Sequence, residues 1–223
     1  NFSYYDLPFP NLSVIGPNVR LFRDSNAKGV FMQANAMGDA GDMCDLRNYL
    51  MARTLWNPEL ESDALVKEFC TLHYGEAAAP ILEYLKLVED QAEKHGNHPN
   101  CGAFPVELGL TPEGVAKGFE LFQQALSLAP NDTVRARVEM ASIPTYRAVI
   151  VANGRPWKNE GGVVRRDLPE RFASVIPDYI ALCKKYNMSY VAEGKESSKY
   201  FDQLEKMAAM PAVSLENDVW RMT

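Results

Sequence analysis

The sequence is short of most features that would place it in a well-marked class. No apolar run approaches the roughly 20 residues of a membrane-spanning helix, so no membrane span is expected. Blocks of lysine or arginine are missing and the formal net charge is −6, which argues against nucleic acid or anionic membrane as a partner. The P-loop, the GxGxxG fingerprint, the nucleophile elbow and a Ser-His-Asp order are also missing, and no cofactor is predicted.

Cysteine and histidine are scarce, with four and three residues respectively. No CxxC pair occurs, and a chain of this length needs no disulfide for stability, so the disulfide state stays open. His95, His98 and Cys101 are spaced three apart in an expected loop, but no fourth ligand is evident and no metal site is predicted. Three other cysteines fall on expected helix faces, where free buried thiols are typical: Cys44, Cys70 and Cys183.

Apolar residues recur at helical spacing almost everywhere after Pro58. Residues 59–223 are therefore predicted to form an α-helical domain. We expect Thr111 to cap one of its helices and Asp132 to cap a long one that Pro144 kinks, and we expect Pro177 to interrupt a later helix. The predicted stripes begin at Leu65, Ala78, Val115, Val134, Phe172 and Tyr200.

The first 58 residues follow a different pattern. The apolar run at 29–32 is typical of a buried strand that ends at Gln33, and the aromatic run at 2–5 predicts another. Helices are expected at about 17–24 and 43–56, the second capped by Asp42 and stopped by Pro58. This β-α-β-α order suits parallel strands, and two such strands alone make a poor sheet. We therefore expect further strands from an upstream segment or another protomer.

Polar and aromatic side chains follow both expected strands. Tyr4, Tyr5 and Asp6 end the first strand, and Gln33 and Asn35 follow the second. Parallel neighbours would bring both sets to one rim, where α/β folds bind ligands. Rings that stack on sugar C–H faces, beside amides that bind hydroxyls, predict an oligosaccharide or polysaccharide ligand. The alternative is a capped loop with both tyrosines in the core, and the catalytic residues are unknown.

Two tryptophans have competing interpretations. Trp56, at a helix end, is expected to anchor two layers, with a pocket wall as the alternative. Trp157 lies among Arg155, Lys158, Arg165 and Arg166 in a glycine-rich stretch. A solvated loop with the ring tucked down is favoured there over a site for an acidic ligand.

Four spaced motifs resemble a known bacterial group: NVRLF at 18–22, KGVFMQ at 28–33, the run at 45–58 and HYGEAA at 73–78. Over roughly residues 1–95 the chain resembles the C-terminal part of a domain of unknown function. That domain is found in secreted glycosidase-like proteins distantly similar to α-glucuronidases and β-hexosaminidases. The resemblance implies that residues 1–58 are the closing units of a (β/α)8 barrel and that the location is extracellular or periplasmic.

In such barrels the active site lies at the carboxyl ends of the strands. The resemblance therefore implies that Tyr4, Tyr5, Gln33 and Asn35 lie at or near a sugar subsite. Most of the barrel, where related glycosidases carry their catalytic acids, is not part of this sequence. No catalytic acid can be assigned by resemblance.

A second resemblance concerns residues 118–132, which look like the second helix of a tetratricopeptide unit. Such arrays need about three repeats, and one is visible, so a single helical hairpin is expected. The sequence as a whole predicts a mainly α protein, a helical bundle appended to a βαβα remnant of a barrel. The predicted function is the C-terminal portion of a glycoside-hydrolase-like protein, and the alternative is a non-catalytic helical protein-interaction module.

Overall fold

The computed structural model describes residues 1–34, 40–96, 98–153, 157–160, 163–166, 170–209 and 213–215, with side chains for 1–34, 40–96, 98–152 and 174–209. Most of this part of the chain is helical, so the prediction of a mainly α protein is confirmed. The helices are α1 (Leu12–Asp24), α2 (Cys44–Trp56), α3 (Ser62–Tyr74), α4 (Ala78–Lys94), α5 (Pro112–Leu128), α6 (Asp132–Asn153), α7 (Glu170–Lys185) and α8 (Ser197–Ala209), with short 3-10 turns η1 (Gly75–Ala77) and η2 (Pro105–Leu108).

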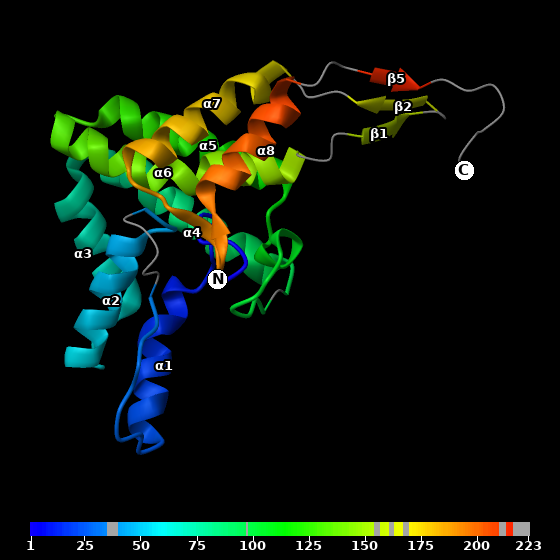
Figure 1. Cartoon of the computed structure of the whole chain (residues 1–223). Coiled ribbons are helices and arrows are strands. Elements are labelled where there is room, and N and C mark those ends of the chain that lie inside the picture. The colour runs from blue at the N-terminus through cyan, green and yellow to red at the C-terminus, as the bar shows by residue number, and fades with distance from the viewer. Residues whose placement is uncertain are drawn as a thin grey trace.

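The helices α4 to α8 form a stack, and α1, α2 and α3 project from one end of it (Figure 1). Within the stack, α5 packs between α4 and α6, and α7 packs on α6 and α8. Two small antiparallel sheets complete the described part: one has the order β1-β2-β5 and the other pairs β3 with β4. The strands are β1 (Trp157–Glu160), β2 (Val163–Arg166), β3 (Tyr190–Ala192), β4 (Lys195–Glu196) and β5 (Val213–Leu215).

Two hydrophobic cores hold the helices together, and α6 belongs to both. The first core joins α1 to α5 with the first half of α6 and contains Phe122, which is fully buried. The second core joins the rest of α6 to α7, α8 and the N-terminal segment (residues 1–10), and it contains Leu7 and Tyr179. The N-terminal segment is therefore part of the interior although it has no regular secondary structure.

Local signals placed several helix ends correctly. The Thr111 side chain accepts a hydrogen bond from Gly114 N at 3.1 Å, and Pro112 opens α5, as predicted. The helices α6 and α7 run through Pro144 and Pro177, so neither proline ends its helix. The predicted cap of α2 was wrong, because Met43 takes the cap position and the Asp42 carboxylate bonds elsewhere.

The strands predicted at 2–5 and 30–32 are not formed, so the barrel remnant is not shown. A strand exists only through hydrogen bonds to neighbouring strands. Residues 29–34 make no hydrogen bond to any group that the structure describes, and the Phe31 side chain is 88% exposed. The first described strand is β1, within the stretch that was expected to be a loop.

In the described ranges no helix combines the length and the apolar character needed to cross a lipid bilayer.

The first core predicts a large difference between two otherwise similar substitutions. Phe122→Ala should lower the free energy of unfolding by about 3–5 kcal/mol, because it leaves a cavity among buried side chains. Leu72→Ala, at a side chain that is 76% exposed, should change it by less than about 0.5 kcal/mol. Urea denaturation followed by circular dichroism measures both, and similar losses for the two variants would contradict the assigned core.

Candidate functional site

The N-terminal segment is fixed by backbone hydrogen bonds to distant parts of the chain. Tyr5 N donates to Val191 O at 2.9 Å, and Asp42 N donates to Tyr5 O at 3.0 Å. Glu193 N donates to Phe2 O at 2.8 Å. Residues 2–5 are thus bound on one side by β3 and on the other by the loop that leads into α2.

Asp6 lies at the centre of a buried polar cluster. Its carboxylate is fully buried, accepts a hydrogen bond from the Tyr179 hydroxyl and lies 3.4 Å from Arg147 Nε. The Arg147 guanidinium carbon is 3.8 Å from the centre of the Tyr200 ring and 5.8 Å from that of Tyr4. This cluster joins the N-terminal segment to α6, α7 and α8.

Complete burial raises the pKa of the Asp6 carboxyl, an effect that outweighs the opposing influences of Arg147 and the Tyr179 hydroxyl. The sequence predicted that Asp6 contacts sugar, and that contact stays a prediction. A sugar hydroxyl could reach this enclosed carboxylate only if the N-terminal segment opened.

The remaining predicted site residues lie nearer the surface. Tyr4 and Tyr5 are half-buried against the second core. Burial raises the pKa of the Tyr5 hydroxyl, and the negative charge of Glu193 raises it further. Gln33 is exposed, and Asn35 lies outside the described residues. No hydrogen bond joins Gln33 to either tyrosine within the described part of the chain. The structure therefore brings Tyr4, Tyr5 and Asp6 together but does not place Gln33 against them.

A second cluster, around Arg47, holds the end of the N-terminal segment. Arg47 Nη2 donates to Phe9 O at 2.6 Å, and Arg47 Nε donates to Asp42 O at 2.8 Å. Its guanidinium also forms an ion pair with the Asp42 carboxylate and donates a hydrogen bond to Asn11 Oδ1. The same Asp42 carboxylate accepts a hydrogen bond from Phe9 N at 2.9 Å, which is why it does not cap α2.

Sequence reasoning identified neither arginine, because their partners are set by tertiary structure. The only available signal was the position of Arg47 within the motif at 45–58. Arg147 stands in an apolar helical stretch, where a buried charge needs a partner that the local pattern does not reveal.

In the part of the chain that is described, no group of histidine, cysteine, aspartate and glutamate side chains is arranged to hold a metal ion. His73 lies in the last turn of α3, as predicted, and stacks on Phe69 with ring centres 4.6 Å apart. Burial and the nearby Arg137 lower the pKa of His73. Cys70 and Cys183 are buried, as predicted, and burial raises the pKa of Cys70 to about 12, so this thiol is unreactive.

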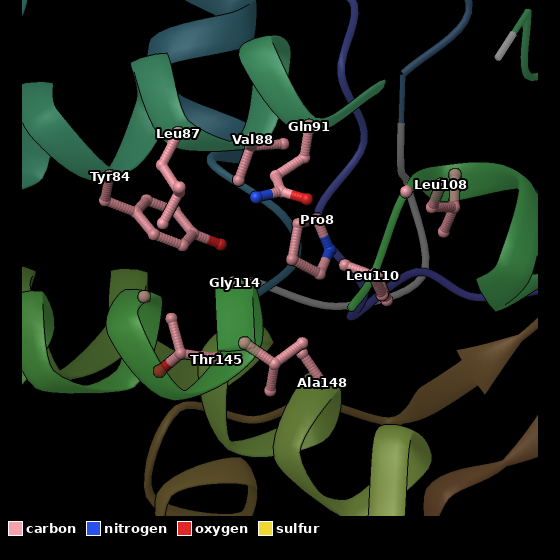
Figure 2. A pocket seen from close by; sticks show the side chains of 13 residues that line it. Pro8, Tyr84, Leu87, Val88, Gln91, Leu108, Leu110, Gly114, Thr145 and Ala148 are labelled. Carbon is pink, nitrogen blue, oxygen red and sulfur yellow. The ribbon is translucent and has the colours of Figure 1, made fainter. Parts of the chain in front are cut away.

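A narrow cavity lies between α4, α5 and α6, beside Pro8 (Figure 2). Its lining is mostly apolar, and the Tyr84 hydroxyl points into it (Figure 2). A Cβ at Gly118 would lie 3.1 Å from the Tyr84 ring, and one at Gly114 would lie 3.2 Å from the Gln91 amide. These two glycines let α4 and α5 approach closely at the floor of the cavity.

Large apolar side chains are exposed mainly on the three projecting helices and the segment between α1 and α2. Trp56 is 92% exposed, so the prediction that it anchors two layers was wrong. The Trp157 side chain lies outside the described side chains. We call the exposed set the α1–α3 apolar surface: Val14, Leu21, Phe22, Val30, Phe31, Leu55, Trp56 and Leu72.

Residues 1–86 match the family described as Domain of unknown function (DUF4838). The match covers less than half of the chain and includes the N-terminal segment, α1 to α3 and part of α4. It supports the predicted resemblance as far as this domain is concerned. No curated protein and no solved structure matches the chain.

The buried Asp6 predicts a characteristic dependence of stability on pH. Because the pKa of Asp6 is raised above its ordinary value of 3.8, the folded protein holds this proton where the unfolded chain has released it. The contribution of Asp6 to the free energy of unfolding is therefore greatest at low pH and falls as the pH rises through the raised pKa. Urea denaturation of the wild type and Asp6→Asn from about pH 4 to about pH 7 measures this contribution as a difference.

The wild type should lose stability relative to Asp6→Asn as the pH rises. Asp202→Asn is the matched control, since Asp202 is exposed on α8, and this variant should follow the wild type throughout. If the wild type instead gained on Asp6→Asn with rising pH, the ion pair with Arg147 would dominate over burial and our assignment would be wrong.

Proposed function

We propose that this chain is the C-terminal portion of a glycoside-hydrolase-like, carbohydrate-active protein. In this proposal residues 1–58 complete a (β/α)8 barrel and residues 59–223 form its helical support. The observation that carries the proposal is the α1–α3 apolar surface, which lies within the range that matches the family. Exposed apolar side chains mark an interaction site where they adjoin one another, which is part of this proposal.

The outer side of α1 supplies part of this surface. Val14, Leu21 and Phe22 recur at helical spacing and are exposed. Ile15 and Val19 are buried, and Ile15 lies seven residues before Phe22, so it shares a side of the helix with it. The apolar side of α1 is therefore broad and is covered only in part by its neighbours, which supports a further layer of protein against α1.

The segment at residues 29–34 supplies the rest of the argument. It leads from the end of α1 back to the loop before α2 and makes no hydrogen bond to any described group. Its Val-Phe-Met sequence favours a strand, and an unpaired extended segment is a ready site for strand addition. A neighbouring strand from upstream would pair this backbone and cover Phe31.

The proposed sugar contacts are Tyr4, Tyr5, Gln33 and Asn35. The hydrogen bond from Asp42 N to Tyr5 O supports their proximity, because it ties the loop that follows Gln33 to the N-terminal segment. Hydrolysis of a glycosidic bond uses a pair of carboxylic acids, and we assign neither to this chain. They would come from the upstream part of the barrel, and the protein would act outside the cytoplasm.

A second candidate is a helical interaction module without catalysis. Trp56 on α2 and Leu72 on α3 favour it, because both are exposed on helices rather than on the expected strand. Tryptophan is enriched at the centres of protein interfaces. The two candidate functions differ in the ligand, which is a sugar for the first and another protein for the second.

Sugar binding provides one test. The protein expressed from the start of its reading frame should bind an oligosaccharide in calorimetric titrations. Gln33→Ala should weaken that binding about tenfold, the loss of one good hydrogen bond to a hydroxyl. Gln203→Ala is the matched control, an exposed glutamine on α8, and should bind as the wild type does. Capture of a protein partner without any sugar binding would favour the interaction module.

The apolar surface provides another test. Phe31→Ser should change the free energy of unfolding of residues 1–223 by less than about 0.5 kcal/mol, because the side chain is exposed there. In the protein that includes the upstream sequence, the same change should cost about 3 kcal/mol, because Phe31 is then buried. Denaturant titration of both forms gives the two values.

Val106→Ser is the control, since Val106 is 80% exposed and lies outside the apolar surface. It should be neutral in both forms. An upstream reading frame that encodes no further β/α units, or a neutral Phe31→Ser in the longer protein, would contradict the proposal.

A further inference from the structure

The tight turn between β3 and β4 places Glu193 beside the N-terminal segment. Ala192 pairs with Lys195, so Glu193 and Gly194 make the whole connection. Gly194 has a φ of +67°, which a residue with a side chain rarely adopts, so the turn depends on this glycine. Glu193 N donates to Phe2 O at 2.8 Å, and this bond fixes the turn against the segment. The hairpin that leads into α8 accordingly lies next to the N-terminus (Figure 1).

Tyr5 is close enough to Glu193 for the carboxylate charge to act on its hydroxyl. Tyr5 N donates to Val191 O at 2.9 Å, two residues before Glu193. Burial is the first cause of the raised pKa of Tyr5, and the charge of Glu193 is the second. The Tyr4 ring, in contrast, is associated with the buried Arg147, whose guanidinium carbon lies 5.8 Å from the ring centre. Tyr5 is therefore the tyrosine that acts together with Glu193.

These two side chains offer complementary hydrogen-bonding groups to a sugar. The Glu193 side chain is exposed and forms no ion pair with any described residue, so its oxygens are open to hydroxyl donors. The Tyr5 phenol is only half-buried, and with its raised pKa it keeps its proton and can donate to a sugar oxygen. A carboxylate that accepts from a hydroxyl makes a charge-assisted hydrogen bond, about twice as strong as a neutral one.

The charge of Glu193 also discriminates between classes of sugar. A uronic acid carries a carboxylate of its own, and two like charges in close contact repel each other strongly near a protein surface. Two of the nearby cations already have carboxylate partners. Lys199 Nζ lies 3.1 Å from Glu196, and Arg147 Nε lies 3.4 Å from Asp6. A sugar with free hydroxyls and no charge therefore fits this place better than a uronic acid.

We infer that Tyr5 and Glu193 form one sugar subsite and that this subsite takes a neutral sugar rather than a uronic acid. Its assignment rests on the proposed function, since Tyr5 is one of the sugar contacts proposed there. It extends that function in two ways. The helical domain supplies a sugar contact in addition to its role as a support, and Glu193 sets the charge preference of the site.

A glycan array provides the test, with the protein expressed from the start of its reading frame. The probes are matched pairs of glucose, galactose or mannose oligosaccharides, in which one member is neutral and the other is oxidised to a carboxylate at C6. The wild type should bind the neutral member about tenfold more tightly.

Glu193→Gln keeps the size of the side chain and removes its charge. It should bind the neutral member about fivefold more weakly and reduce the preference within a pair to about twofold. Glu205→Gln removes the same charge from an exposed position on α8 and is the matched control. It should bind both members as the wild type does. Circular dichroism of each variant verifies that it is folded.

Two results would overturn the subsite and leave the proposed function standing. Glu193→Gln could bind sugar with the full preference of the wild type. Alternatively, the wild type could bind the carboxylate member more tightly, in which case Lys195, exposed on β4, would dominate over Glu193. No binding to any probe would contradict the proposed function and the subsite together.

Discussion

The burial of the N-terminal segment is the constraint on which the rest of the structure depends. A segment without regular structure must find a partner for each buried polar group separately. Here the partners come from far along the chain: Arg147 and Tyr179 meet Asp6, and β3 meets Tyr5. Leu7, fully buried in the second core, adds an apolar anchor. The segment thereby joins the stack of helices to the loop that leads into α2.

This constraint explains why the two ends of the molecule differ. The stack of helices buries most of its own apolar side chains, and its buried Arg147 lies beside Asp6 of the N-terminal segment. The projecting helices α1 to α3 bury one side against each other and leave the α1–α3 apolar surface exposed. The unpaired backbone at 29–34 belongs to the same region. The proposal of a barrel rests on these two properties, because further protein would cover the apolar side chains and pair the backbone.

The helical stack could be predicted from sequence because its signals are local. Spacing of apolar residues and the Thr111-Pro112 cap are contained in short windows. The strands could not be predicted in this way, since a strand depends on hydrogen bonds to neighbours that lie far away in the sequence. Asp42 had the right residue type and position for a cap, but Arg47 and Phe9 compete for its carboxylate. The sugar-site residues were chosen for a rim of two strands. Only the three in the N-terminal segment are seen to cluster.

We propose that residues 29–34 pair as a strand with an upstream neighbour, whereas the N-terminal segment is already held by its own hydrogen bonds. Hydrogen exchange of backbone amides tests it most directly, in residues 1–223 and in the protein with its upstream sequence. The amides of Tyr5 and Asp42 should be protected in both forms, because both donate in the folded stack or its loop. The amides of Val30 and Phe31 should exchange freely in the first form and become protected in the second. Free exchange at 30 and 31 in both forms would contradict the account.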